Sequence, residues 1–349
     1  MNGPEPQFQV EFLANVQRLL SEGSFVASYK FALLLALADL AVEHGDDRGA
    51  ALDLTARQLA DKFIHYYWRQ ATPYLTPRSP DGVVLAQNTG RQATILTKIQ
   101  AVRMTTPELS VYRRSKDWAR LLDEVAGVVK VMPLWKLQTV GSGTLDFLYE
   151  NVGRGSVITL RPGVAACLRK FHLLLGDLVR GAWVRYVRRF NEVELGEVND
   201  LHEFLFGSER RSLQAVVPVL RDVQGGECFY CGKALGAQTT HVDHFIPWSR
   251  YPVDLGHNFV LAHDRPCNSA KSDRLASGEH LRRWTERNET HADVLRQEFD
   301  RGGIVHDLPT SVAIARWAYR QLSGTHGTVW LAGDRLVPLD AGWERWLVG

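Results

Sequence analysis

Side chains suited to metal binding and acid-base chemistry are concentrated in residues 228–271. In chain order they are Cys228, Cys231, Asp243, His244, Asn258, Cys267, Asn268 and Lys271. Paired thiolates hold zinc in structural sites, whereas a carboxylate, an imidazole and amides suit the metal-assisted hydrolysis of a phosphodiester. The segment therefore predicts two metal sites with different tasks.

Each residue type in this segment answers one requirement of phosphodiester hydrolysis. Asp243 offers an anionic oxygen and Asn268 a neutral amide oxygen, and such ligands suit Mg²⁺ or Mn²⁺ better than zinc. His244 is suited to act as the general base that takes a proton from water, because an imidazole titrates near neutral pH. Together they predict a cation site beside a base.

This order of residues resembles the HNH endonucleases, or ββα-metal nucleases, and specifically their zinc-stapled branch. The resemblance covers about residues 227–275, and the three letters of the family name fall on His244, Asn258 and Asn268. It implies two antiparallel strands over residues 239–247 and 259–263, and a helix from 266 to about 276. Asp243 and His244 would point to opposite sides of the first strand, so the strand must bend for both to reach one phosphate.

The resemblance also implies roles for the residues around the base. Asn258 would join the connecting loop to the strand and orient the imidazole of His244. Lys271, with Arg265, would bind a phosphate near the start of the helix.

The fourth ligand of the expected zinc site is open. Members of the family usually have a cysteine three residues before the last one, where this chain has Asp264. His263, one residue earlier, is the better zinc ligand. The site therefore has His263 or Asp264 as its fourth ligand, or holds no metal, and we favour zinc with His263.

The rest of the chain predicts a mainly α protein with one small α+β module. Residues 1–215 form the expected helical domain, which would bind DNA or select the target, residues 216–290 the HNH module, and residues 291–349 a helical extension packed on the rest. The apolar run at 31–38 predicts a buried helix. Thr55 predicts the N-cap of a helix that ends near Arg69, and further helices are expected at 88–103 and 115–130.

Two short strands are predicted around a turn, at residues 145–149 and 157–160. Helices followed by such a hairpin form winged-helix modules that bind DNA. The alternative is a hairpin that only covers a helical core.

A basic helix is the expected contact with the DNA backbone. Residues 161–190 contain seven lysines and arginines against one acid, and Arg185, Arg188 and Arg189 share one helical face. Leu168, Phe171, Leu175 and Leu178 give the segment an apolar stripe that should be buried. The alternative is a solvated helix face whose acidic neighbours come from the tertiary structure.

Composition limits the remaining possibilities. The net charge is only +2 in 349 residues, so any attraction to nucleic acid must be local. The longest apolar run is too short to span a bilayer, and the first residues do not resemble a secretion signal, so we expect a cytoplasmic protein without a membrane partner. Four cysteines do not predict a disulfide framework.

The leading hypothesis is a metal-dependent HNH endonuclease that cuts double-stranded DNA in restriction or anti-phage defence. A homodimer would allow single-site modules to cut both strands. One alternative is a zinc-stapled nucleic-acid-binding module without catalysis. Another is a nuclease effector subunit that a partner must activate.

Overall fold

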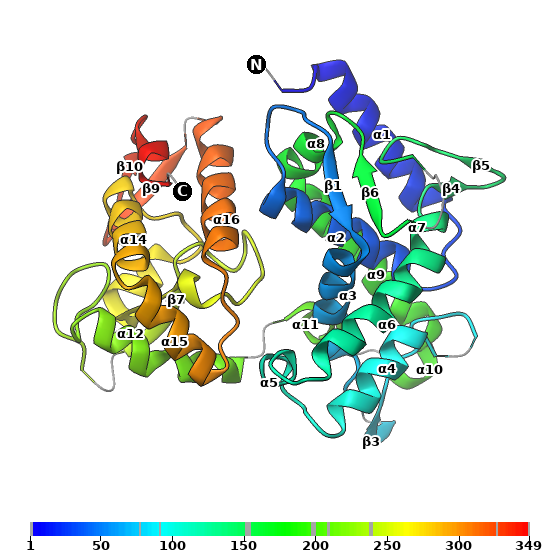
Figure 1. Cartoon of the computed structure of the whole chain (residues 1–349), viewed down its shortest axis with the longest axis horizontal. Coiled ribbons are helices and arrows are strands. Elements are labelled where there is room, and N and C mark those ends of the chain that lie inside the picture. The colour runs from blue at the N-terminus through cyan, green and yellow to red at the C-terminus, as the bar shows by residue number, and fades with distance from the viewer. Residues whose placement is uncertain are drawn as a thin grey trace. The chain divides into compact units, whose positions relative to one another are not determined.

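The chain folds into two compact units, residues 1–207 and 208–349 (Figure 1). The computed structural model describes residues 3–76, 78–90, 92–150, 155–196, 200–207, 210–236, 240–325 and 327–347. Helices predominate, and the strands form two-stranded antiparallel sheets. The prediction of a mainly α chain with a small β content is confirmed. No described helix has the length and apolar character needed to cross a membrane.

The first unit is a helical assembly built around α2. Its helices are α1 (Pro6–Glu22), α2 (Tyr29–His44), α3 (Ala56–Gln70), α4 (Thr94–Arg103), α5 (Leu109–Arg113), α6 (Trp118–Val131), α7 (Pro133–Lys136), α8 (Val164–Lys170), α9 (His172–Phe190), α10 (Glu192–Leu195) and α11 (Leu201–Phe206). Its strands are β1 (Leu52–Thr55), β2 (Tyr74–Thr76), β3 (Ser79–Val83), β4 (Thr139–Val140), β5 (Gly143–Thr144) and β6 (Val157–Leu160).

Helix α2 is buried along almost its whole length, as its sequence predicted. Leucine and alanine occupy every side of the helix, and 14 of its 16 residues are buried against α3, α8 and α9. Helix α3 begins where the sequence indicated. The Thr55 hydroxyl accepts a hydrogen bond from the backbone N–H of Gln58, and the Gln58 side chain accepts one from the backbone N–H of Thr55.

The predicted strand at residues 157–160 is confirmed as β6, but its predicted hairpin with residues 145–149 is wrong. Strand β6 pairs with β1, about 100 residues earlier in the chain, in the register Leu52↔Leu160 to Thr55↔Val157. Residues 145–149 form no strand and meet β6 only through the single bridge between Tyr149 and Leu160. Part of the expected turn, residues 151–154, lies outside the described residues. The winged-helix interpretation therefore loses the hairpin on which it rested.

The second unit combines a small ββα arrangement with a helical remainder. Its elements are η1 (Arg210–Val216), α12 (Val217–Val223), β7 (Thr240–His244), η2 (Gly256–Asn258), β8 (Phe259–His263), η3 (Asp264–Asn268), α13 (Ser269–Lys271), α14 (Gly278–Thr290), α15 (Ala292–Gly302), α16 (Leu308–Ser323), β9 (Thr328–Ala332), β10 (Arg335–Pro338) and η4 (Trp343–Leu347). Strands β7 and β8 pair antiparallel, with His244 opposite Phe259 and Thr240 opposite His263.

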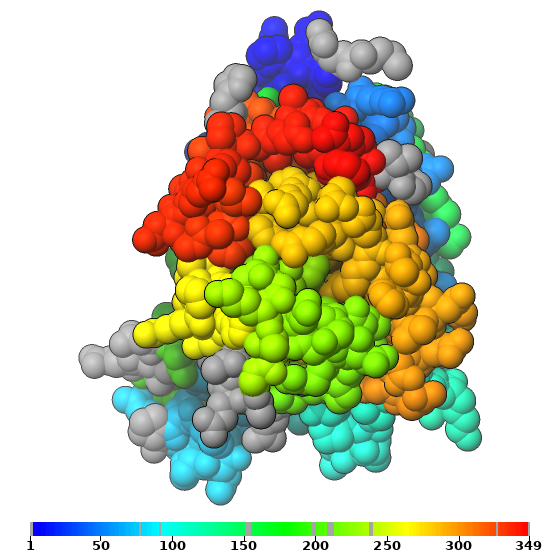
Figure 2. Space-filling view, turned by 90° about the vertical axis from the view of Figure 1, so that its left-hand side faces the viewer, coloured from blue at the N-terminus to red at the C-terminus, as the bar shows by residue number. Residues whose placement is uncertain are grey.

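The C-terminal hairpin β9–β10 is joined to the segment that follows α13. The backbone N–H of Trp330 donates to Leu275, and that of Ser277 donates to Trp330. The ring of Trp330 also packs edge-on against Tyr230, with the ring centres 5.2 Å apart. In Figure 2 this C-terminal segment, in red, covers the upper part of the visible face of the unit. The C-terminal residues therefore contribute to the core around the cysteine-containing segment.

Candidate metal and nuclease site

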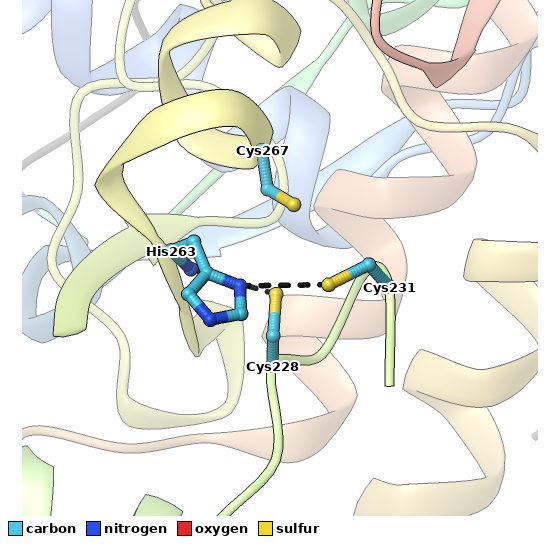
Figure 3. Close-up of side chains that lie close together, drawn as sticks. All are labelled: Cys228, Cys231, His263 and Cys267. Carbon is cyan, nitrogen blue, oxygen red and sulfur yellow. Dashed lines mark hydrogen bonds between the residues drawn. The ribbon is translucent and has the colours of Figure 1, made fainter. Parts of the chain in front are cut away.

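Three cysteines and one histidine converge in the second unit (Figure 3). The ligand atoms of Cys228, Cys231, His263 and Cys267 all lie within 4.8 Å of one another. Cys228 and Cys231 lie in a tight turn closed by hydrogen bonds from Gly232 to Cys228 and from Cys228 to Lys233. His263 ends β8 and Cys267 lies in η3. We call this group the thiolate cluster, and it could bind a metal such as zinc.

The donor set of the thiolate cluster fits a tetrahedral zinc ion. Zinc with Zn–S bonds of about 2.3 Å holds its ligand atoms about 3.8 Å apart, which these positions can reach with small movements. Burial alone would raise the pKa of Cys228, but backbone N–H groups, chiefly those of Cys231 and His263, lower it to about 7. Burial and the neighbouring Cys228 raise the pKa of Cys267. A bound cation would allow all three thiols to ionise together.

His263 is the fourth member of the thiolate cluster, so of the two candidates for the fourth ligand the structure favours His263 over Asp264. Its Nδ1 lies 3.5 Å from Cys231 Sγ, and its Nε2 lies 3.2 Å from the carbonyl oxygen of Ala234. A ring that donates from Nε2 presents an unprotonated Nδ1 to the metal, as second-shell contacts to metal-binding histidines generally do. Asp264 is exposed and does not belong to the cluster.

Asp243 is buried beside the thiolate cluster and is held by two donors. The hydroxyl of Tyr230 lies 2.5 Å from Oδ2, and Nζ of Lys271 lies 3.0 Å from the same oxygen. Burial, followed by the Asp243 charge, holds the pKa of Tyr230 well above its usual range, so the phenol donates. Only 8% of Asp243 is exposed, and a carboxylate in such a place requires partners of this kind.

Lys271 lies in the short helix α13, but its ammonium group is not free to bind a phosphate as the resemblance implied. It is fully buried, with Nζ paired to Asp243 and donating to the carbonyl oxygen of His244 at 2.9 Å. A lysine without exposed surface cannot contact a DNA phosphate in this arrangement, so its expected phosphate contact does not fit. Arg265 is exposed in η3, and its phosphate contact stays a prediction.

The helix after the thiolate cluster is shorter than predicted. It was expected from 266 to about 276, but α13 ends at Lys271 because Ser272 leaves the helical region, with φ of 50° and ψ of −128°. Helix α14 begins only at Gly278. Asn268, half-buried, lies at the junction of η3 and α13.

His244 has a carboxylate partner that the sequence did not predict. Its Nε2 lies 2.8 Å from Oδ1 of Asp254, and since a carboxylate only accepts, Nε2 carries the proton. The ring is further enclosed by Trp248 and Phe259. Asp254 is the only acidic residue between His244 and Asn258, which is the one signal that could have indicated it.

Asn258 fixes the backbone that follows His244 rather than the imidazole. Its side chain accepts from the backbone N–H of Ile246 at 2.8 Å and donates to the carbonyl oxygen of Ile246 at 3.0 Å. The backbone carbonyl of Asn258 accepts from Phe245. These hydrogen bonds hold the loop against the end of β7, so Asn258 affects His244 through the backbone. Asp254, in contrast, contacts the imidazole ring itself.

Strand β7 stops earlier than expected. It ends at His244 instead of Pro247, and Thr239 lies outside the described residues. Asp243 faces Tyr230 and Lys271, whereas His244 faces Asp254. The two neighbouring side chains thus contact different groups on opposite sides of the strand, as its alternation requires.

The basic helix α9 belongs to the first unit. Arg185 and Arg189 are exposed and Arg188 is half-buried. The apolar stripe is only partly as predicted, because Leu175 is buried but Leu178 is 46% exposed.

A surface cavity of about 340 Å³ lies elsewhere in the second unit. Its walls include the start of α14, the β9–β10 hairpin and Trp346, and none of its lining residues belongs to the thiolate cluster or to the surroundings of His244.

Comparison of the chain with family models, with curated proteins and with solved structures finds no match in any of the three.

Proposed function

We propose that the chain is a Mg²⁺- or Mn²⁺-dependent HNH endonuclease that hydrolyses phosphodiester bonds in double-stranded DNA. The observation that carries the proposal is the pair His244–Asp254 at the end of β7, directly beside the buried carboxylate of Asp243. The β7–β8 pair followed by the turn of η3 and α13 supports it, because it has the order of a ββα-metal module.

The side chains divide the chemistry among them. His244 accepts the proton of the attacking water at Nδ1, since Nε2 is occupied by Asp254. Asp254 holds the ring in that tautomer, and Asn258 holds the backbone beyond it. Asp243 and Asn268 would hold the divalent cation, which neutralises phosphate charge and stabilises the departing oxygen when bound.

The thiolate cluster has a structural task in this proposal. Zinc held by Cys228, Cys231, His263 and Cys267 would connect the tight turn that carries the first two cysteines to the end of β8 and to η3. The exposed arginines Arg185 and Arg189 of α9 support a DNA contact in the first unit, and the biological setting we propose is restriction or anti-phage defence.

One observation favours a second function. The buried ion pair of Lys271 with Asp243 already neutralises the carboxylate that would bind the cation. A zinc-stapled module that binds nucleic acid without cutting it is therefore the competing proposal. A nuclease that needs an activating partner differs from both in requiring that partner for any cleavage.

Supercoiled plasmid incubated with Mg²⁺ or Mn²⁺ tests the proposal. We expect nicked and linear DNA with the native protein, and intact plasmid with His244→Ala or with EDTA. Retention of the plasmid in a gel shift, with no nicking in Mg²⁺ and none in Mn²⁺, would favour the binding module instead.

A further inference from the structure

The two donors that hold Asp243 both come from the segments that carry the cysteine ligands. Tyr230 lies between Cys228 and Cys231, and Lys271 follows Cys267 by one helical turn. Both reach the same oxygen, Oδ2 of Asp243, at 2.5 and 3.0 Å. The carboxylate expected to bind a catalytic cation is thus connected to the thiolate cluster from two directions.

Neither donor lies in a helix or strand long enough to fix its position by local structure alone, although the ring of Tyr230 packs against Trp330. Lys271 ends α13, a helix of three residues, and a helix that short is not stable by itself. Tyr230 lies in the tight turn between two cysteines, outside any helix or strand. A metal ion shared by Cys228, Cys231 and Cys267 would hold these two segments at a fixed separation.

Burial makes the arrangement sensitive to small movements. Lys271 is fully buried, and Tyr230 is 5% exposed, so water cannot replace either donor at Asp243. Lys271 also donates to the carbonyl oxygen of His244, so the side chain that holds Asp243 also contacts the backbone of the proposed base. Displacement of one donor would leave a buried charge or a buried carboxylate oxygen without its partner.

Resting on the proposed function, we propose that Tyr230 and Lys271 are positioning residues that couple the two metal sites. Zinc at the thiolate cluster sets the positions of both donors, and the donors set the orientation of Asp243 toward a divalent cation. Occupancy of the structural site therefore controls affinity at the catalytic site. Hydrogen bonds to a ligating carboxylate typically change metal affinity by about 10- to 100-fold.

The deciding variant is Tyr230→Phe in the full chain, since it removes one hydroxyl and keeps the buried ring. Mn²⁺ is the probe, titrated without DNA and followed by the electron paramagnetic resonance signal of the free ion, and zinc is measured by elemental analysis. We expect full zinc content, an unchanged melting temperature within a few degrees, and Mn²⁺ affinity about tenfold weaker. Tyr319→Phe is the matched control, because Tyr319 is fully buried in the same unit and its hydroxyl donates to the carbonyl oxygen of Ala276 and not to Asp243.

The second arm removes zinc at its exposed ligand. Loss of zinc should destabilise the second unit, so Cys231→Ser is informative only where its melting curve shows that it stays folded. In a folded Cys231→Ser protein, zinc content and Mn²⁺ affinity should be lost together, and otherwise Tyr230→Phe decides alone. Native Mn²⁺ affinity in Tyr230→Phe, or in a folded zinc-free Cys231→Ser, overturns the coupling. So does native Mn²⁺ binding that survives Asp243→Asn.

The same titration separates this inference from the proposed function. Mn²⁺ binding that depends on Asp243 and Tyr230, in a protein that never nicks plasmid, supports the coupling and overturns the nuclease. Plasmid nicking by a Tyr230→Phe protein of native Mn²⁺ affinity supports the nuclease and overturns the coupling.

Discussion

Removal of the Asp254 carboxylate is the sharpest test of what sets the tautomer and orientation of the proposed base, His244. Asp254→Ala leaves Nε2 of His244 without its acceptor at 2.8 Å, so the ring can exchange tautomers and rotate. In the native protein the carboxylate selects the tautomer with a free Nδ1, and we expect the variant to spend part of its time with the proton on the wrong nitrogen.

The expected decrease in cleavage rate follows from the burial of His244 and Asp254. A hydrogen bond to a charged partner contributes roughly 1.5–3 kcal/mol. The side chains of His244 and Asp254 are 13% and 27% exposed, so water weakens the interaction and the lower end of that range applies. About 1.5 kcal/mol corresponds to roughly a tenfold slower chemical step.

Two measurements check this prediction. Single-turnover nicking of supercoiled plasmid should slow about tenfold with little change in DNA affinity, whereas Ser249→Ala, an exposed substitution in the same loop, should cut at the native rate. The nitrogen chemical shifts of the His244 ring should report a single tautomer in the native protein and a mixture in Asp254→Ala. Native rates together with an unchanged tautomer would refute the positioning role.

Three further predictions concern the same unit. His244→Ala should abolish nicking while leaving the melting temperature and the gel shift nearly native, and cutting by that variant would exclude His244 as the base. Cys228→Ala should unfold the second unit, since structural zinc contributes about 10–16 kcal/mol to folding in small zinc domains, and purified native protein without zinc would contradict this. Burial lowers the pKa of His257 to about 3 and that of His280 to about 4. Below pH 6.5 the unfolded chain therefore binds more protons than the folded protein, and the free energy of unfolding should fall as the pH drops from about 6.5 toward 4. The fall should reach about 3 kcal/mol for His280 alone. Urea unfolding at pH 7.5 and pH 5 should show about 2 kcal/mol of the His280 contribution, and His280→Gln should reduce the difference.

Local signals predicted the parts of the structure that local interactions determine. The buried helix α2 follows from its composition, and the start of α3 from the pair Thr55 and Gln58, which satisfy each other's backbone groups. The positions of β7 and β8 and the gathering of the cysteines were implied by the resemblance to the HNH endonucleases and not by local signals. Only α2 and the start of α3 could be predicted from neighbouring residues alone.

The features that the sequence did not predict depend on distant or non-repetitive contacts. Strand β6 has a partner about 100 residues away, and a strand pattern alone does not specify its partner. The end of α13 depends on the backbone conformation of Ser272, a residue type that does not by itself indicate a positive φ. The burial of Lys271 follows from its pairing with Asp243, which no spacing rule encodes.

The alternation of β7 bears directly on the proposed reaction. From the sequence, the opposite directions of Asp243 and His244 were an obstacle, because both had to reach one phosphate. In-line hydrolysis, however, requires the attacking water and the departing oxygen on opposite sides of the phosphorus. A phosphate lying across the end of β7 would meet His244, the proposed base, from one side and Asp243, the proposed cation ligand, from the other, since these side chains contact Asp254 and Tyr230 respectively. A strand whose regular pairing with β8 continues to His244 therefore suits the proposed chemistry. A variant that exchanged the two residues, Asp243→His with His244→Asp, should retain no cleavage although it keeps both side-chain types.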